Sequence, residues 1–90
     1  MWNSFSLLDF MLEEELLDLM TFCLQNPQSS EIDEKKNRII EIGKELHADG
    51  GVDAMENFFF AIKNRITEEI GKDPEPFRSL WNGIDDEWNH

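Results

Sequence analysis

The sequence predicts an all-α fold, a compact bundle of four helices that forms a single domain over residues 1–90. The first observation is periodicity: apolar residues recur at spacings of three and four in four segments, and no segment alternates convincingly with period two. The second is that proline or glycine follows each segment, at Pro27, Gly50–Gly51, Gly71 and Gly83. We therefore expect helices at about 6–25, 31–48, 53–70 and 74–82, the last one short, with frayed ends at about 1–4 and 86–90.

The first expected helix carries an unusually wide apolar face. Ser6 can cap it, with Asp9 three residues further on. Its apolar arc covers roughly 200°, against about 100° for an ordinary surface helix. Such a helix is either central to the bundle or pressed against a second copy. Because a chain of 90 residues offers little companion surface, we expect other protein to cover it. The candidate interface residues are Trp2, Phe5, Leu8, Leu12, Leu16 and Leu19.

Three glycines in the middle of the chain are expected to be structural. Gly43 lies inside the second expected helix, where glycine costs about 1 kcal/mol relative to alanine. The usual reason to tolerate that cost is close approach of another backbone, so Gly43 predicts a helix crossing. Gly50 and Gly51 end this helix, since glycine readily adopts the left-handed conformation that follows a helix. The third helix then presents one apolar stripe, formed by Val52, Met55, Phe59, Ile62, Ile66 and Ile70.

The fourth expected helix begins at Asp73–Pro74, because an acidic cap followed by proline suits a first helical turn. Gly83 ends it, and Ile84 is expected to fold back onto it. Trp81 and Trp88 are expected to pin this capped end. Some aromatic side chains either cover the ends of the bundle or form a patch that meets another chain, namely Trp2, Phe5, Phe58, Phe60 and Trp88.

Composition excludes several classes of function. The chain has 20 acidic and 8 basic residues, a net charge of −12, which repels nucleic acid and anionic membranes and favours a basic partner. The same charge can simply keep the chain soluble. The first basic residue is Lys35, so no secretory signal is expected. Five acidic residues interrupt the apolar stretch 7–24, so this stretch is not expected to span a membrane. A single cysteine, Cys23, cannot form an internal disulfide, which fits a reducing cytoplasm.

From about residue 36 to 88 the sequence resembles a group of small uncharacterised bacterial proteins. The residues that carry the resemblance are Ile42–Gly43, Leu46, Gly50–Gly51, Met55, Leu80–Trp81–Asn82–Gly83–Ile84 and Trp88. The likeness covers about the last three fifths of the chain and leaves out the first helix. It implies a bacterial source and brings no activity, cofactor or catalytic residue with it.

No set of residues in the sequence indicates catalysis or metal binding. His47 lies near the end of the second helix, where an imidazolium interacts favourably with the helix dipole, and a structural role is expected. Cys23 has apolar neighbours, which raise the pKa of a thiol. The residue three before His47 is Lys44, so the Glu-x-x-His spacing of a di-iron bundle fails. We expect no cofactor, no metal and no catalytic residue.

Two functions remain. The first is a non-enzymatic protein–protein interaction module, an acidic helical bundle that forms a homodimer through its first helix. The alternative is an acidic inhibitor that occupies a basic partner such as a nuclease. Length, helix count and charge loosely resemble colicin immunity proteins, although this chain has no tyrosine and no binding motif that matches residue by residue.

Overall fold

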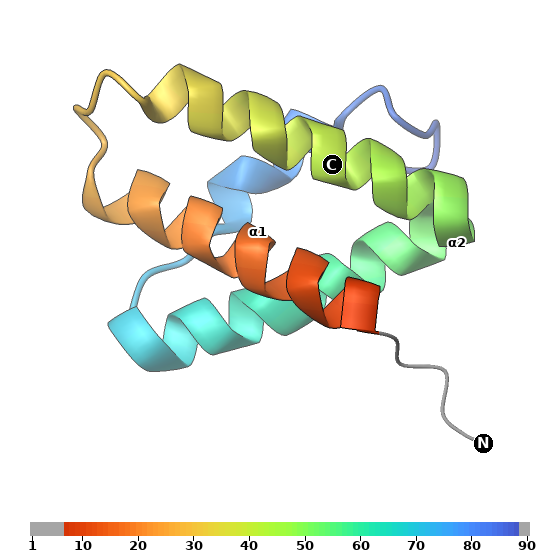
Figure 1. Ribbon diagram of the computed structural model, residues 1–90, viewed down its shortest axis with the longest axis horizontal. Coiled ribbons are helices and arrows are strands. Elements are labelled where there is room, and N and C mark those ends of the chain that lie inside the picture. The colour runs from red at the N-terminus through yellow and green to blue at the C-terminus, as the bar shows by residue number, and fades with distance from the viewer. Residues whose placement is uncertain (1–6, 89–90) are drawn as a thin grey trace.

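The computed structural model describes residues 7–88, and these residues form three helical elements. Helix α1 spans Leu7–Gln25, helix α2 spans Ile32–Ile70, and the 3-10 helix η1 spans Glu75–Trp81. In Figure 1, α2 folds back on itself, α1 lies in front of its two arms, and η1 lies behind them. The expected all-helical, compact fold is confirmed, whereas the expected bundle of four separate helices does not match.

The second and third expected helices form the single element α2, which kinks sharply at Gly50 and Gly51. The two glycines have φ/ψ of −143°/15° and 70°/−161°, and the helix resumes immediately after them. The sequence therefore locates the break, but Gly51 does not adopt the expected left-handed helix-end conformation. Its φ/ψ lies in a region that is essentially restricted to glycine. We call residues 32–49 the first arm of α2 and residues 52–70 the second arm.

The fourth helix is a 3-10 helix, where we expected an α-helix over 74–82. Its hydrogen bonds run from residue i+3 to residue i: the N–H of Phe77 donates to the carbonyl of Pro74 at 2.9 Å, and that of Asn82 to Ser79 at 3.1 Å. Two prolines, Pro74 and Pro76, fall within this short segment, and neither has an N–H to donate. Both prolines lie at the start of the helix, where an N–H would have no partner in either helix type, so they do not exclude the α form. The segment is only seven residues long, and short segments readily take the tighter helix.

The central leucines of the apolar face of α1 are buried inside their own chain, which corrects the expectation that other protein covers them. Leu12, Leu16 and Leu19 are 9%, 0% and 9% exposed. The physical reason is that the two arms of α2 run on either side of α1, and a helix held between two neighbours needs a wide apolar arc (Figure 1). The core comprises Leu12, Leu16, Leu17, Leu19, Met20, Cys23, Ile39, Ile42, Leu46, Met55, Phe59, Ile62, Ile66, Trp81 and Trp88.

Gly43 packs against the indole of Trp81, and not against a helix backbone as expected. A Cβ at Gly43 would lie 2.5 Å from Trp81 Nε1, so only glycine fits without a shift. The Trp81 indole N–H donates to the carbonyl of Ile39 at 2.9 Å, one turn before Gly43. Trp81 packs in turn against Trp88 at a tilt of 53°, with ring centroids 5.2 Å apart, and both indoles make edge-to-face contacts with Phe59. The C-terminal segment is thereby locked onto the first arm of α2.

The C-terminal turn follows an extended Asn82 and has a positive φ at Gly83, and the segment beyond Ile84 differs from the frayed tail that was expected. Gly83 has a φ of 92°, and the N–H of Ile84 donates to the carbonyl of Trp81 at 3.2 Å. Trp88 lies in the tail that was expected to fray from residue 86, yet it is 2% exposed, and its indole N–H donates to the carbonyl of Arg78 at 2.8 Å. The buried indole outweighs the acidic residues around it, because burying so large an aromatic surface is strongly favourable.

Candidate interaction surface

The residues that sequence reasoning proposed as an interface do not form an exposed surface. Leu12, Leu16 and Leu19 belong to the core. Trp2 and Phe5 lie outside the described residues, as does the side chain of Leu8. The exposed apolar part of α1 is instead the pair Phe10 and Met11, which are 47% and 57% exposed. Neither was among the predicted interface residues.

Phe10 and Met11 open onto a groove of about 630 Å³ that runs along α1. Phe22, near the other end of the helix, continues the apolar lining, and Lys35 from the first turn of α2 closes that end. The Nζ of Lys35 lies 5.0 Å from the centre of the Phe22 ring, a cation–π contact that holds both side chains in place. The full lining is Phe10, Met11, Glu14, Glu15, Asp18, Leu19, Phe22 and Lys35.

Three carboxylates occupy the middle of the groove, and they differ in their partners. Glu15 accepts two hydrogen bonds from Arg38 of the first arm, at 2.7 and 2.9 Å. Glu14 accepts one from Arg65 of the second arm at 2.7 Å. Asp18 is exposed, and no ion pair of the described residues includes it. The groove therefore offers one carboxylate that an incoming cation can meet directly.

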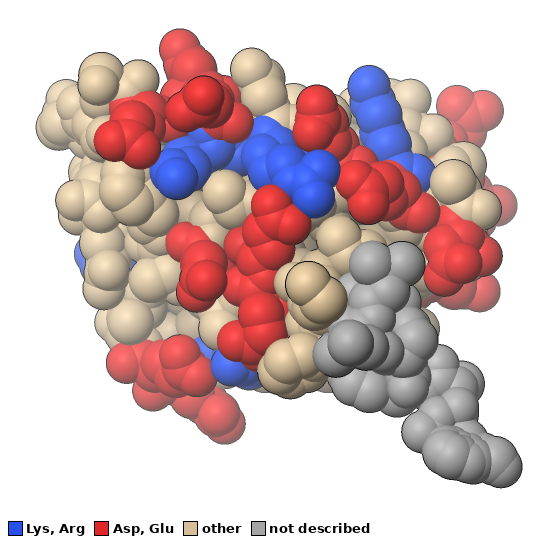
Figure 2. All heavy atoms as spheres, viewed as in Figure 1, with Lys and Arg blue, Asp and Glu red and all other residues tan. Residues whose placement is uncertain are grey.

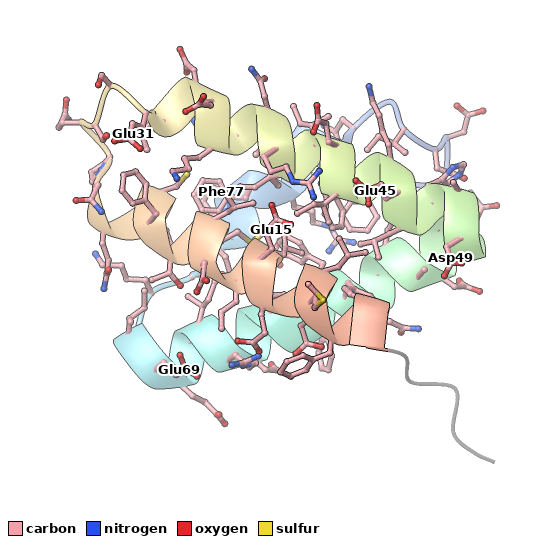
Figure 3. All side chains as sticks on the ribbon, in the orientation of Figure 1. Glu15, Glu31, Glu45, Asp49, Glu69 and Phe77 are labelled. Carbon is pink, nitrogen blue, oxygen red and sulfur yellow. The ribbon has the colours of Figure 1, made fainter. Side chains whose placement is uncertain are left out.

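Each of the two arginines that flank α1 is surrounded by more carboxylates than it can neutralise. Arg38 pairs with Glu15, Glu41 and Glu45 at 2.7 to 3.3 Å. Figure 3 shows Glu15 and Glu45 approaching this cluster from α1 and from the first arm of α2. The hydrogen bond to Glu15 is the main reason that the pKa of Arg38 is raised, and the same bond lowers the pKa of Glu15. Three carboxylates therefore share the single positive charge of Arg38.

Arg65 forms the matching cluster on the other side of α1. It pairs with Glu13, Glu14 and Glu69 at 3.2, 2.7 and 3.8 Å. Hydrogen bonding to Glu14 is the main cause that raises the pKa of Arg65. Figure 2 shows the result on the face that carries α1: red carboxylates surround the few blue cations. These ion pairs tie α1 to both arms and still leave negative charge in excess.

His47 has a partner that sequence reasoning did not find. Its Nε2 lies 2.6 Å from the Oδ2 of Asp85, 38 residues further along the chain. The other oxygen of Asp85 accepts the backbone N–H of Glu87 at 2.7 Å. That backbone bond, followed by the bond to His47, lowers the pKa of Asp85. The pair joins the C-terminal turn to the first arm of α2.

Cys23 lines a second, smaller hollow of about 230 Å³ between α1, the start of α2 and η1. The thiol belongs to the core, and burial is the main cause that raises its pKa. A thiol in this state is a poor nucleophile, because the thiolate is the reactive form. The remaining residues of the hollow are Leu24, Pro27, Ile32, Lys36 and Phe77.

Between residues 7 and 88 no three histidine, cysteine or carboxylate side chains are grouped so that they could hold a metal ion. Nor is any helix within this stretch long and apolar enough to span a bilayer. Comparison of the chain with protein-family models, with curated proteins and with solved structures finds no match. The groove along α1 is therefore interpreted from its geometry and charge.

Sequence reasoning missed the groove for a specific reason. The interface was predicted from the apolar arc of the first helix alone, whereas Glu14, Glu15 and Asp18 lie on the opposite side of the helix wheel. The structure shows that Phe10, Met11 and Phe22 border these carboxylates. A signal was present in the sequence, since the exposed Met11 sits four residues before Glu15 and seven before Asp18, on one face of a helix.

Proposed function

We propose that this chain is a non-enzymatic interaction module that binds a basic partner protein through the groove along α1. The observation that carries the proposal is the combination in one groove of two exposed apolar side chains, Phe10 and Met11, with the carboxylate of Asp18, which forms no ion pair with any residue that the structure describes. Apolar side chains supply binding energy when they leave water, while carboxylates select a partner of opposite charge. If this side of α1 were only solvated surface, the carboxylates would suffice and no exposed apolar side chains would be needed beside them.

The charge of the whole molecule supports a basic partner. A net charge of −12 on 90 residues attracts cationic surfaces over a distance and speeds their encounter. The two arginine clusters add to this field next to the groove, since each leaves two carboxylates unneutralised. An acidic inhibitor of a basic protein such as a nuclease is one form that this function can take. We place it in a bacterial cytoplasm, where Cys23 stays reduced.

The proposal is tested by capturing partners from a lysate of the source organism on immobilised chain. Wild type is compared with Asp18→Lys, which reverses the charge in the groove, and with Glu68→Lys, which makes the same change at an exposed residue of the second arm. Mass spectrometry should find basic proteins that wild type and Glu68→Lys retain and that Asp18→Lys loses. Identical retention by all three would show that the groove does not bind the partner.

Self-association is a second candidate, favoured by a different observation. Phe60 is the most exposed large apolar side chain of the described residues, at 66%, and it lies on the second arm rather than in the groove. A two-fold contact through Phe60 would produce the homodimer that the sequence led us to expect, through a different surface. Light scattering after size exclusion tests it: Phe60→Ser should convert a dimer to a monomer, and a monomeric wild type removes this candidate.

A further inference from the structure

The groove has a repeating pattern along α1. Met11, Glu15, Asp18 and Phe22 follow one another at spacings of four, three and four residues, which places them on a single stripe of the helix. The stripe is apolar at both ends and acidic in the middle. Eleven residues separate its ends, a distance of about 16 Å along the helix axis. This length corresponds to about three helical turns.

We propose that the occupant of the groove is a basic amphipathic helix of the partner protein, about three turns long, with apolar residues at both ends and Lys or Arg between them. This inference rests on the proposed function and names the element that the groove takes. A helix laid along α1 repeats with the same spacing, so apolar residues at i and i+11 meet Phe22 and Met11 while cations at i+4 and i+7 meet the carboxylates.

Charge decides between the possible occupants. A second copy of this chain would place its own carboxylates against Glu14, Glu15 and Asp18, which is unfavourable. The first six residues of the chain carry aromatic side chains but no Lys or Arg, so they supply no cationic side chain for Asp18. A basic amphipathic helix matches both the apolar ends and the acidic middle of the stripe. It buries Phe10 and Met11, and it pairs with Asp18, which forms no ion pair with the described residues.

Lys35 gives the groove a direction. Its ammonium lies at the Phe22 end, 3.8 Å from Glu31, whereas the carboxylates of the groove lie between Phe22 and Met11. Cations of the bound helix are therefore attracted to the middle of the groove and repelled from the Phe22 end. Removing the charge of Lys35 should strengthen binding, and a gain of this kind cannot arise from misfolding.

The experiment uses three labelled synthetic peptides and fluorescence anisotropy on the full chain. The probe is a Leu/Lys peptide of about 16 residues, because shorter isolated helices are marginal in water. It carries leucines and lysines at the spacings given above. One control replaces every lysine with glutamate, and the other shuffles the same residues so that no amphipathic face remains. The Leu/Lys probe should bind at least about tenfold more tightly than either control, since it alone matches both the charge and the spacing.

Variants of the chain then locate the binding. Asp18→Lys should weaken binding of the Leu/Lys probe roughly tenfold, because attraction becomes repulsion, while Glu68→Lys with the same change in net charge should leave it within about twofold. Met11→Ser should weaken it and Met11→Leu should preserve it. Lys35→Ala should tighten it. Circular dichroism of each variant confirms that the helices are intact.

Four results would overturn the inference. These are failure of the Leu/Lys probe to bind, equal binding of the shuffled peptide, equal effects of Asp18→Lys and Glu68→Lys, or a wild-type dimer that Met11→Ser dissociates, which would assign the groove to a second copy. The proposed function fails separately. If lysate capture depends on Asp18 but the Leu/Lys probe does not bind, the groove binds protein of another shape; if capture is independent of Asp18, the function itself is wrong.

Discussion

At the scale of single residues, Gly43 is held by its contact with Trp81. A methyl group at this position would lie 2.5 to 2.7 Å from three atoms of the indole, which a hydrogen bond to Ile39 holds in place. Alanine gains about 1 kcal/mol in helix propensity, but forcing an extra carbon into a packed site costs about 1–3 kcal/mol and endangers that hydrogen bond. We expect Gly43→Ala to destabilise the fold by about 1–2 kcal/mol, measured by guanidinium unfolding.

The contact with Trp81 is tested by a double-mutant cycle. In a Trp81→Phe background the smaller ring leaves room for the methyl group, so Gly43→Ala should cost less there than in wild type. Equal costs in the two backgrounds would show that the indole is not what selects glycine. The sequence indicates that something approaches Gly43 closely, but it cannot name the neighbour, because Trp81 lies 38 residues away on an element whose position depends on the whole fold.

The carboxylate of Asp85, which pairs with His47, should make the stability of the fold depend on pH in the acidic range. The pKa of Asp85 is lowered from its ordinary value of 3.8, so its contribution is complete above that value and is lost as pH falls through the folded-state pKa below it. Asp85→Asn should therefore be less stable than wild type at neutral pH, and the difference should shrink below pH 3.8.

Thermal unfolding at several pH values measures this difference, and Asp86→Asn is the matched control. Asp86 is the neighbouring exposed acid, and no hydrogen bond or ion pair of the described residues includes it. Its variant should follow wild type throughout. A gap between wild type and Asp85→Asn that stays constant from neutral pH to below pH 3.8 would mean that the carboxylate charge does not hold the C-terminal turn.

At the scale of elements, the kink of α2 depends on one backbone conformation. Gly51 has φ 70° and ψ −161°, where residues with a Cβ are strained, and nothing lies within 4 Å of an added methyl group. The cost of Gly51→Ala is therefore a backbone cost, about 1–3 kcal/mol. Gly71, at φ 69° and ψ 21°, has the ordinary left-handed conformation of a helix end.

Asparagine separates these two glycines, because it tolerates the left-handed helical conformation but not the region that Gly51 occupies. We expect Gly71→Asn to be nearly neutral and Gly51→Asn to destabilise the fold about as much as Gly51→Ala. Guanidinium unfolding of the three variants Gly51→Ala, Gly51→Asn and Gly71→Asn checks this. Similar stabilities of Gly51→Asn and Gly71→Asn would show that the chain relaxes at the kink and that the conformation of Gly51 is not required.

The element scale also shows what the sequence could and could not predict. Periodicity and glycines place the helices and the break within a few residues, because both are local properties. The width of the apolar face of α1 is also local, but its meaning is not: the arc implies two neighbours, and only the back-folded α2 shows that both belong to the same chain. In the same way, Pro74 and Pro76 locate the start of η1, because proline suits the first turn of a helix, but they do not decide between its α and 3-10 forms.

At the scale of the whole molecule, excess negative charge should make the fold more stable in salt. The carboxylates in each arginine cluster repel one another, and one guanidinium offsets only one of three. Screening relieves this repulsion together with that of the net charge of −12. We expect Tm to rise with sodium chloride; a gain of 1 kcal/mol corresponds to about 4–8 °C in a domain of this size. A fall in Tm would show that the ion pairs outweigh the repulsion.

Partner binding should respond to salt in the opposite direction. Raising ionic strength from about 0.1 M to about 1 M shortens the Debye length from about 10 Å to about 3 Å, which weakens attraction between the groove and a basic helix. Over the same range the fold should become more stable, so weaker binding of the Leu/Lys peptide cannot be blamed on unfolding. Binding by Glu68→Lys should show nearly the same slope as wild type, whereas binding by Asp18→Lys should lose most of it, because the screened contact is then absent. Equal slopes for the two variants would assign the salt dependence to the net charge of the chain and not to the carboxylate in the groove.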